Sequence, residues 1–446
     1  MKTTRIRRTA VPVVGIAVAA LALSACAPPT GPGGEEIDCA DYEAYGTPGG
    51  EVELYTTIAG VEADQLQESV DAYSFCTETE VNLVSSQEFE TQINVRVQGG
   101  DAPDLAIFPQ PGLLQRIAST GAVVAAPAEV EANVDEYWTE AWKEYGTVDG
   151  TFYAAPLMAS VKGYIWYSPA QFEELGVEVP TTWQGLMDLT AQLAENNTDT
   201  YRPWCVGFGS GDATGWPGTD WIEDLVLREA GPDAYDAWVA GELPFDSPEI
   251  SAAWESAGEI LRNPEYVNGG YGGVESINST TFNDGGLPIL EDNCSLHHQA
   301  SFYEAQWPEG TTVAPDGDIW AFLTPPVNEG DPASVTGGGE FVAAFNDNEE
   351  TAALQAFLSS SEWANIRVEL GGVISANNGL DPAVAGSDIG RQSIEILQGE
   401  DTVFRFDGSD LMPAAVGSAS FWTGLVDWIG GKDTTQTLQD IDATWP

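Results

Sequence analysis

The hydrophobic pattern changes from strand-like to helical three times in the first part of the chain. Residues 51–57 alternate in strand-like fashion, and apolar residues follow at helical spacing over 66–73. The same change occurs after residues 81–84 and again after 104–108. This β-α-β-α-β-α order predicts a parallel sheet covered by helices, with ligands at the carboxyl ends of its strands. Those ends lie at 58–62, 85–87 and 108–111.

Strands and helices continue beyond residue 150, although less regularly. A strand pattern over 151–168 precedes helical patterns over 169–175 and 183–193, and another strand is expected at 337–345. A chain of 446 residues is too long for one small core. We therefore expect two domains.

The first 26 residues have the form of an export signal. A basic head precedes an apolar run over 11–23, and Leu23-Ser24-Ala25-Cys26 matches the cleavage pattern of bacterial lipoproteins. A membrane anchor is the alternative, but a run of about 13 residues is short against the roughly 20 that a span needs. We therefore expect residues 1–25 to be removed, Cys26 to carry lipid and 26–48 to form a flexible tether. The chain would then be held at the outer face of the bacterial plasma membrane.

The charge balance excludes one class of partner. The chain has 15 Lys and Arg against 70 Asp and Glu, a formal net charge of −55 at pH 7. Phosphate binding needs a basic face, so we exclude nucleic acid as a partner. The acidity itself indicates a solvated, self-repelling surface. The 15 tryptophans are more informative, because sugar rings pack on exposed indole faces.

Four cysteines remain once Cys26 is assigned to lipid. In an oxidising compartment they predict two disulfides, for which three pairings exist. We favour Cys39–Cys76, which brackets the first strand and helix, together with Cys205–Cys294. A zinc site is the alternative, but the cysteines lack C-x-x-C spacing and the chain's two histidines are adjacent. We expect no metal and no cofactor.

Enzyme motifs are missing from the sequence. It contains no G-x-S-x-G nucleophile elbow, no P-loop and no H-E-x-x-H helix. A glycosidase needs only two suitably spaced carboxylates, however. A secreted carbohydrate-active hydrolase therefore stays open as an alternative.

Several motifs stand in an order that is typical of one family. The sequence resembles the extracellular solute-binding proteins (family 1) of carbohydrate ABC importers in Gly-Gly-Asp-Ala-Pro-Asp-Leu at 99–105, Tyr-Ala-Ala-Pro-Leu at 153–157, Trp-Tyr-Ser at 166–168 and Pro-Thr-Thr-Trp at 180–183. The likeness resumes at 337–360 and 412–422. It narrows to the α-glucoside-binding branch through Gly-Trp-Pro at 215–217, Asp-Trp-Ile-Glu-Asp at 220–224 and Phe-Arg-Phe-Asp at 404–407.

The resemblance implies a two-lobed α/β fold like that of type II periplasmic binding proteins. Each lobe would be a mainly parallel sheet flanked by helices, and crossings near 157–162, 326–337 and 372–376 would act as hinges. Such a protein is a monomer that performs no covalent chemistry and delivers its ligand to ABC permease subunits. The lobes would comprise 49–156 plus 335–372 for the N-lobe and 157–334 plus 373–446 for the C-lobe.

A sugar site needs aromatic platforms for the apolar ring faces and planar polar groups for the hydroxyls. We choose Trp216, Trp221 and Trp422 as platforms, because Trp422 falls in the family's C-terminal Phe-Trp motif and the other two lie in the α-glucoside-like stretch. The polar candidates follow the first three strands, lie in the C-lobe or lie near the crossings: Glu62, Gln87 and Gln110; Asp212, Asp220, Gln299 and Arg405; Lys162 and Glu340.

The sequence therefore predicts a lipid-anchored receptor for an α-glucoside such as maltose, trehalose or sucrose. Besides the hydrolase, a binding protein for another small solute is the alternative, for example for a polyol or a glycerol phosphate.

Overall fold

The computed structural model describes residues 37–86, 88–269, 273–399 and 402–446. The expected signal peptide, the lipidation site Cys26, most of the tether and the candidate Gln87 lie outside these ranges. The chain divides into two compact units, Met1–Asp38 and Cys39–Pro446. Everything below concerns the second unit.

A six-stranded sheet contains the three strands that the N-terminal pattern predicts. β1 pairs in parallel with β2 on one side and β3 on the other. β12 runs antiparallel to β3 and β6 but parallel to β13, so the sheet is mixed and β12 joins distant parts of the chain. The strands are β1 (Glu51–Thr56), β2 (Glu80–Ser85), β3 (Leu105–Phe108), β6 (Ala154–Val161), β12 (Ser334–Ala344) and β13 (Val403–Phe406).

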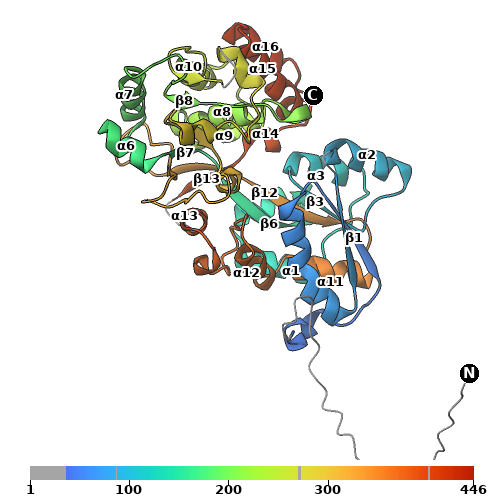
Figure 1. Ribbon diagram of the computed structural model, residues 1–446. Helices are drawn as coiled ribbons and strands as arrows, with labels where there is room; N and C mark the ends of the chain where they lie inside the picture. Colours follow the sequence, from blue (N-terminus) through green and yellow to red (C-terminus); the bar gives the residue numbers. More distant parts are fainter. Residues whose placement is uncertain (1–36, 87, 270–272, 400–401) are drawn as a thin grey trace, which may run out of the picture. The chain divides into compact units, whose positions relative to one another are not determined.

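The helices around this sheet form where apolar residues recur at helical spacing. Leu66, Val70 and Tyr73 of α1 are buried, as their spacing predicts. Figure 1 shows α1, α2, α3 and α11 around β1 and β3. The helices are α1 (Val61–Thr77), α2 (Phe89–Gly99), α3 (Pro111–Ala118), α4 (Ala128–Tyr137), α5 (Glu140–Tyr145), α11 (Glu349–Leu358) and α12 (Ser361–Glu369).

A second sheet has three antiparallel strands, with β7 (Tyr164–Tyr167) between β10 (His297–Gln299) and β11 (Trp320–Leu323). This differs from the mainly parallel sheet expected for the C-lobe. The physical reason is the direction of the connections, because the chain enters β10 and β11 beside the end of β7 rather than its start. Two short pairs complete the strands: β4 (Thr147–Val148) with β5 (Thr151–Phe152), and β8 (Trp204–Cys205) with β9 (Val267–Asn268).

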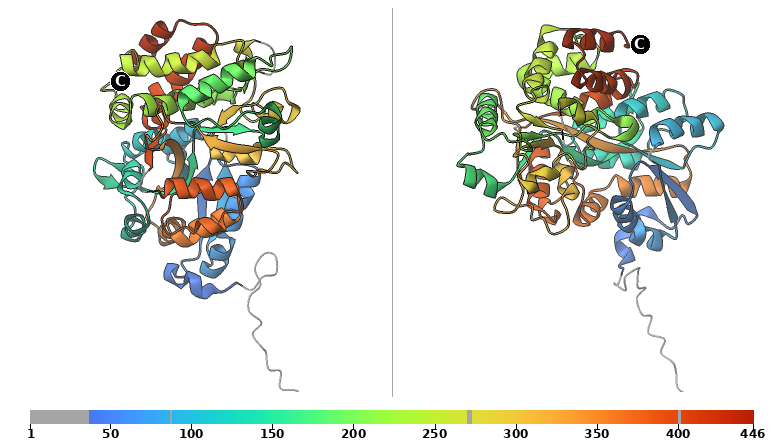
Figure 2. Two further views of the ribbon diagram at one scale, coloured as in Figure 1. Left: turned by 90° about the vertical axis from the view of Figure 1, so that its left-hand side faces the viewer. Right: turned by 45° about the horizontal axis from the view of Figure 1, so that its top comes forward.

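The remaining helices pack around the second sheet and near the C-terminus. Ser168 and Ser247 directly precede α6 and α10 and cap them. The hydroxyl of each serine accepts a hydrogen bond from the backbone N–H three residues on, and a proline follows each serine as the first helical residue. Figure 2 shows the dark red C-terminal helices beside the green to yellow helices α8 to α10. The helices are α6 (Pro169–Leu175), α7 (Trp183–Ala194), α8 (Trp216–Glu229), α9 (Pro232–Val239), α10 (Pro248–Leu261), α13 (Asp388–Leu397), α14 (Gly408–Leu411), α15 (Trp422–Ile429) and α16 (Thr434–Asp442).

Buried apolar side chains form three clusters. The first includes Phe108, Phe341 and Phe357 of the six-stranded sheet and its helices. The second gathers around Trp238 and Trp254 of α9 and α10. The third includes aromatic residues of the second sheet, the segment at 301–307 and apolar residues of α13.

The segment from β13 to α14 runs between the first and second clusters. Leu411 packs against the first cluster, whereas Met412 belongs to the second. Gly112 of α3 approaches this segment so closely that a Cβ there would lie 2.8 Å from the carbonyl oxygen of Met412 and 2.9 Å from that of Asp410. Only glycine fits at this contact without a shift of backbone.

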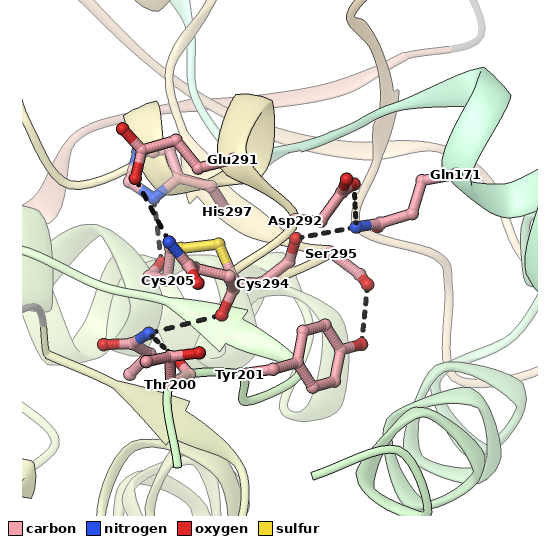
Figure 3. The surroundings of a disulfide bond; sticks show 12 residues. Gln171, Thr200, Tyr201, Cys205, Glu291, Asp292, Cys294, Ser295 and His297 are labelled. Carbon is pink, nitrogen blue, oxygen red and sulfur yellow. Dashed lines mark hydrogen bonds between the residues drawn. A yellow bond between two sulfur atoms is a disulfide. The ribbon is translucent and has the colours of Figure 1, made fainter. Parts of the chain in front are cut away.

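Both disulfides that the sequence favours are present. Cys39–Cys76 ties a 3₁₀ turn to α1, with the two Cα atoms 5.3 Å apart. Cys205–Cys294 joins β8 to the segment before β10, with the Cα atoms 5.7 Å apart. Figure 3 shows its surroundings, where Gln171 donates to the carbonyl oxygen of Cys294. The predicted pairing is confirmed.

Within the described residues, no helix combines the length and the apolar character that crossing a membrane requires.

Candidate functional site

A cavity of about 460 Å³ lies where segments expected in the N-lobe meet segments expected in the C-lobe. This size falls in the range of roughly 300 to 1,000 Å³ that small-molecule sites span. Its walls come from α1, β6, the middle of β12, a 3₁₀ helix at Ser301–Gln306 and α13. Gly339 on β12 permits the close fit, because a Cβ there would lie 2.7 Å from the carbonyl oxygen of Met158.

Two carboxyl groups, those of Glu62 and Glu340, line one part of the cavity, and we call them the Glu62 pair. Burial and the nearby Glu62 raise the pKa of Glu340 to about 8, while Arg367 opposes the shift. Burial also raises the pKa of Glu62, again against the effect of Arg367. The Arg367 side chain is buried on α12 and donates from Nη1 to the carbonyl oxygen of Gly371. Burial and the repulsion between the two carboxyl groups outweigh the effect of the one guanidinium, so the pair tends to retain a proton.

A second ionic group, the Lys162 cluster, consists of Lys162, Asp220, Glu223 and Asp407, all buried. Lys162, which lines the cavity, donates 2.8 Å to Asp220 and also bonds Asp407. Glu223 accepts hydrogen bonds of 3.0 Å from the N–H groups of Gly408 and Ser409, at the start of α14. The cluster therefore holds the segment after β13 against α8.

The charges of the Lys162 cluster are strongly interdependent. Burial alone would lower the pKa of Lys162, but Asp220 and Asp407 outweigh it and raise that pKa well above its usual value. Burial would raise the pKa of Asp407, but Lys162 holds it at about 2. Burial raises the pKa of Asp220 to about 7 despite the same lysine. Oxygens of Asp220, Glu223 and Asp407 lie within 4.8 Å of one another, a spacing that suits a metal ion, but the Lys162 ammonium already serves as their cation.

An aromatic group adjoins the cavity. Phe302 lines it, and the Trp216 ring lies with its centroid 6.0 Å from that of Phe302 and 5.1 Å from that of Phe282. The Lys162 ammonium lies 5.7 Å from the Trp216 centroid. Trp216 therefore connects the Lys162 cluster to the aromatic wall of the cavity.

The structure brings several of the sequence-predicted residues together. Glu62, Lys162 and Glu340 line the cavity, and Asp220 and Trp216 contact Lys162 directly. Gln110 lines a smaller adjoining pocket, which Asp410 also lines. Asp212 belongs to a 3₁₀ turn at Gly211–Ala213.

Four further candidates also lie outside the cavity lining. Trp221 is buried with its ring 4.4 Å from that of His298, and Gln299 uses its side-chain oxygen to accept from the N–H of Ala300. Arg405 forms a two-pronged pair with Asp236, at 2.6 and 2.8 Å. Trp422 begins α15, and its backbone packs against Gly215. As ligand contacts these four stay predictions.

Sequence reasoning did not select Phe302, Glu304, Arg367 and Asp410, which line or support the cavity. Phe302 stands three residues after the chosen Gln299, within a stretch that resembles the α-glucoside-binding branch. Arg367 carried no local signal, because its electrostatic effect on Glu62 and Glu340 arises only from the position of α12 in the folded chain. Its role follows from tertiary structure alone.

Comparison with known proteins decides the family. The family of bacterial extracellular solute-binding proteins matches residues 59–290. The chain belongs to this family. It is 38% identical over 408 residues to the osmoprotective compounds-binding protein GgtB of Synechocystis sp., covering 90% of this chain and 94% of GgtB. It is 37% identical over 398 residues to the alpha-glucosides-binding periplasmic protein AglE of Rhizobium meliloti, covering 86% and 84%.

A solved structure of another bacterial protein has the same fold. The solute receptor AcbH superposes with a TM-score of 0.72 at 18% identity, over 88% of this chain and 97% of AcbH. The expected type II periplasmic-binding-protein fold is thereby confirmed, as is the resemblance to solute-binding proteins of sugar ABC importers. Members of this family bind solutes, and the relatives named here are described as binding proteins or receptors.

Proposed function

We propose that this chain is a lipid-anchored receptor that captures an α-glucoside between two lobes and delivers it to an ABC permease. The observation that carries the proposal is the cavity of about 460 Å³, whose lining includes carboxyl groups and an aromatic side chain. Hydroxyl groups of a sugar would donate to Glu62 and Glu340, and a ring face would pack near Phe302. The similarity to AglE over most of both chains supports an α-glucoside as the ligand.

Capture would require the segments around the cavity to close on the sugar. β6 and β12 belong to the six-stranded sheet, and residues of both strands line the cavity. Two of the expected crossings, at 157–162 and 326–337, overlap these strands. A ligand that contacts both sides binds the closed form better and therefore shifts the population towards it. The permease would recognise that closed form.

The lipid anchor rests on Leu23-Ser24-Ala25-Cys26, outside the described residues. Expression of the full chain with Cys26→Ser should release the protein from membranes into the medium. Mass spectrometry of the wild-type N-terminal peptide should find lipid on Cys26. A wild-type protein that is cleaved elsewhere and carries no lipid would contradict the anchor without affecting the binding function.

A thermal-shift screen of the mature chain, with Cys26→Ser for solubility, tests the ligand class. Maltose, trehalose and sucrose are the first probes, followed by calorimetry on any sugar that raises the melting temperature. A ligand at 100 times its dissociation constant adds about 2.7 kcal/mol to the free energy of unfolding. Release of glucose from the bound sugar would instead support the hydrolase.

A receptor for an osmoprotective solute is the second candidate function. It is supported by the 38% identity to GgtB, which covers 94% of that protein. A screen in which a small polyol or its glucoside protects the protein, and the disaccharides do not, would favour this candidate.

A further inference from the structure

The cationic side chains of Lys162 and Arg367, beside the cavity, are not available to a ligand, because the first is bonded to carboxylates and the second is covered. Lys162 is bonded to Asp220 and Asp407, and Arg367 is only 1% exposed. Among the described residues that line the cavity, Lys162 is the one basic group, whereas four are acidic. The acidic four are Glu62, Glu304, Glu340 and Asp410.

An anionic ligand would therefore gain little and lose much in this cavity. It would give up its hydration, and it would find carboxyl groups in place of a free ammonium or guanidinium. Removing a charge from water without a partner is costly, and like charges at close range add to that cost.

The Glu62 pair is the part of the lining that is free to contact a ligand. Neither carboxyl group accepts a hydrogen bond from another described residue, whereas Glu304 accepts one of 2.7 Å from Ser387. Asp410 belongs electrostatically to the Lys162 cluster, through Asp407 and Lys162. Above the pKa of Glu340, the Glu62 pair carries one more negative charge than Arg367 balances.

We propose that the cavity is a charge filter, in which Glu62 and Glu340 admit uncharged or ammonium-bearing sugars and reject sugars that carry phosphate or carboxylate. This inference rests on the proposed sugar-binding function and narrows its substrate class. It excludes the glycerol phosphate that the sequence left open as an alternative ligand.

Three probes built on one disaccharide test the filter. Trehalose or maltose, whichever raises the melting temperature, is compared by calorimetry with its 6-phosphate and its 6-amino-6-deoxy derivative. Repulsion between one carboxylate and one negative charge on the ligand, about 6 Å apart at an effective dielectric constant of about 20, corresponds to a loss of about 100-fold in affinity. At pH 8.5, where Glu340 is mostly ionised, we expect the phosphate to bind at least about 100-fold more weakly than the neutral sugar, and the amine at least as tightly.

Variants assign the effect to the Glu62 pair. Glu62→Gln and Glu340→Gln should each reduce the ratio of neutral to phosphate affinity about tenfold, whatever they do to the affinity for the neutral sugar. Glu68→Gln is the matched control, because Glu68 is exposed on the same helix and changes the net charge equally. Its ratio should equal that of the wild type.

The outcomes separate the two proposals. If the neutral sugar binds and its phosphate binds within about threefold, the filter is wrong and the receptor function stands. If Glu68→Gln changes the ratio as much as Glu62→Gln does, the whole-protein charge is responsible and the filter is also wrong. If no neutral sugar binds, the function and the filter fall together.

Discussion

The Lys162 cluster is buried and the Glu62 pair is half-buried beside the same cavity, and the two groups differ in how their hydrogen bonds are used. In the Lys162 cluster most oxygens accept from side chains or from backbone N–H groups of α14. In the Glu62 pair the compensating Arg367 acts at a distance, and its Nε and Nη2 atoms have no hydrogen-bond partner.

The difference separates stability from recognition. Removing one member of a satisfied group of buried charges strongly destabilises the fold, because the remaining charges stay buried without compensation. Unsatisfied carboxyl groups that face a cavity hold the fold together only weakly, but they are ready to accept hydrogen bonds from a ligand. Mutation should therefore affect folding at the first group and binding at the second.

The largest effect is expected for Lys162→Met. The substitution leaves Asp220 and Asp407 buried without their cation, so the free energy of unfolding should fall by about 3–5 kcal/mol. Urea unfolding at pH 7.5 measures it. Lys143→Met is the control, because Lys143 pairs with exposed Glu131 and Asp135 and should lose no more than about 1 kcal/mol. Equal losses in the two variants would remove the distinction between the Lys162 cluster and a surface pair.

A smaller effect is expected from pH. The pKa of Glu340 is about 8 in the folded chain against an ordinary value of 4.5, so the folded state binds more protons than the unfolded state between these values. Stability contributed by this group therefore falls as pH rises. Between pH 5.5 and 8.5, Glu340→Gln should lose about 3 kcal/mol less than the wild type, in urea unfolding at each pH. An unchanged slope would show that Glu340 is ionised throughout.

A weaker effect is expected on affinity. Sugar hydroxyls donate to the ionised form of a carboxyl group, so binding should release part of a proton and strengthen as pH rises towards 8. We expect about a threefold gain in affinity for a neutral disaccharide between pH 6.5 and 8.5, and none in Glu340→Gln. Calorimetry in two buffers of different ionisation enthalpy counts the protons released. Uptake of protons on binding would contradict this role of the pair.

The smallest effect is expected for Arg405→Met. The Arg405–Asp236 pair is partly exposed, with side-chain exposures of 29% and 53%, so its loss should cost less than about 0.5 kcal/mol. Affinity for the sugar should not change, because Arg405 lies outside the cavity lining. A tenfold loss of affinity would return Arg405 to the binding site, where sequence reasoning had put it.

These residues show how far sequence reasoning reaches. Glu62 could be predicted because it follows a strand of the regular N-terminal pattern, and Lys162 and Glu340 because they lie at or near the crossings. Arg405 could not be judged, because its partner Asp236 is 169 residues away in the sequence. For Trp221, the sequence does not distinguish an indole that contacts a sugar from one that packs on the ring of His298, as this one does.

The fold divides in the same way. The local order of strands and helices predicted β1, β2 and β3 with their helices, since each parallel connection is short. The antiparallel second sheet and the pairing of β12 with β13 join segments separated by long stretches of chain, and no local pattern reports their direction.

The absence of a side chain at Gly112 allows α3 to approach α14 closely. A methyl group there would press on the carbonyl oxygens of Met412 and Asp410, and a bulkier side chain would press harder. A series of Ala, Val and Leu at position 112 would wedge α3 away from α14 by graded amounts. The size of the side chain at position 112 would thus set the spacing between α3, which follows a strand of the six-stranded sheet, and α14, whose first residues the Lys162 cluster holds.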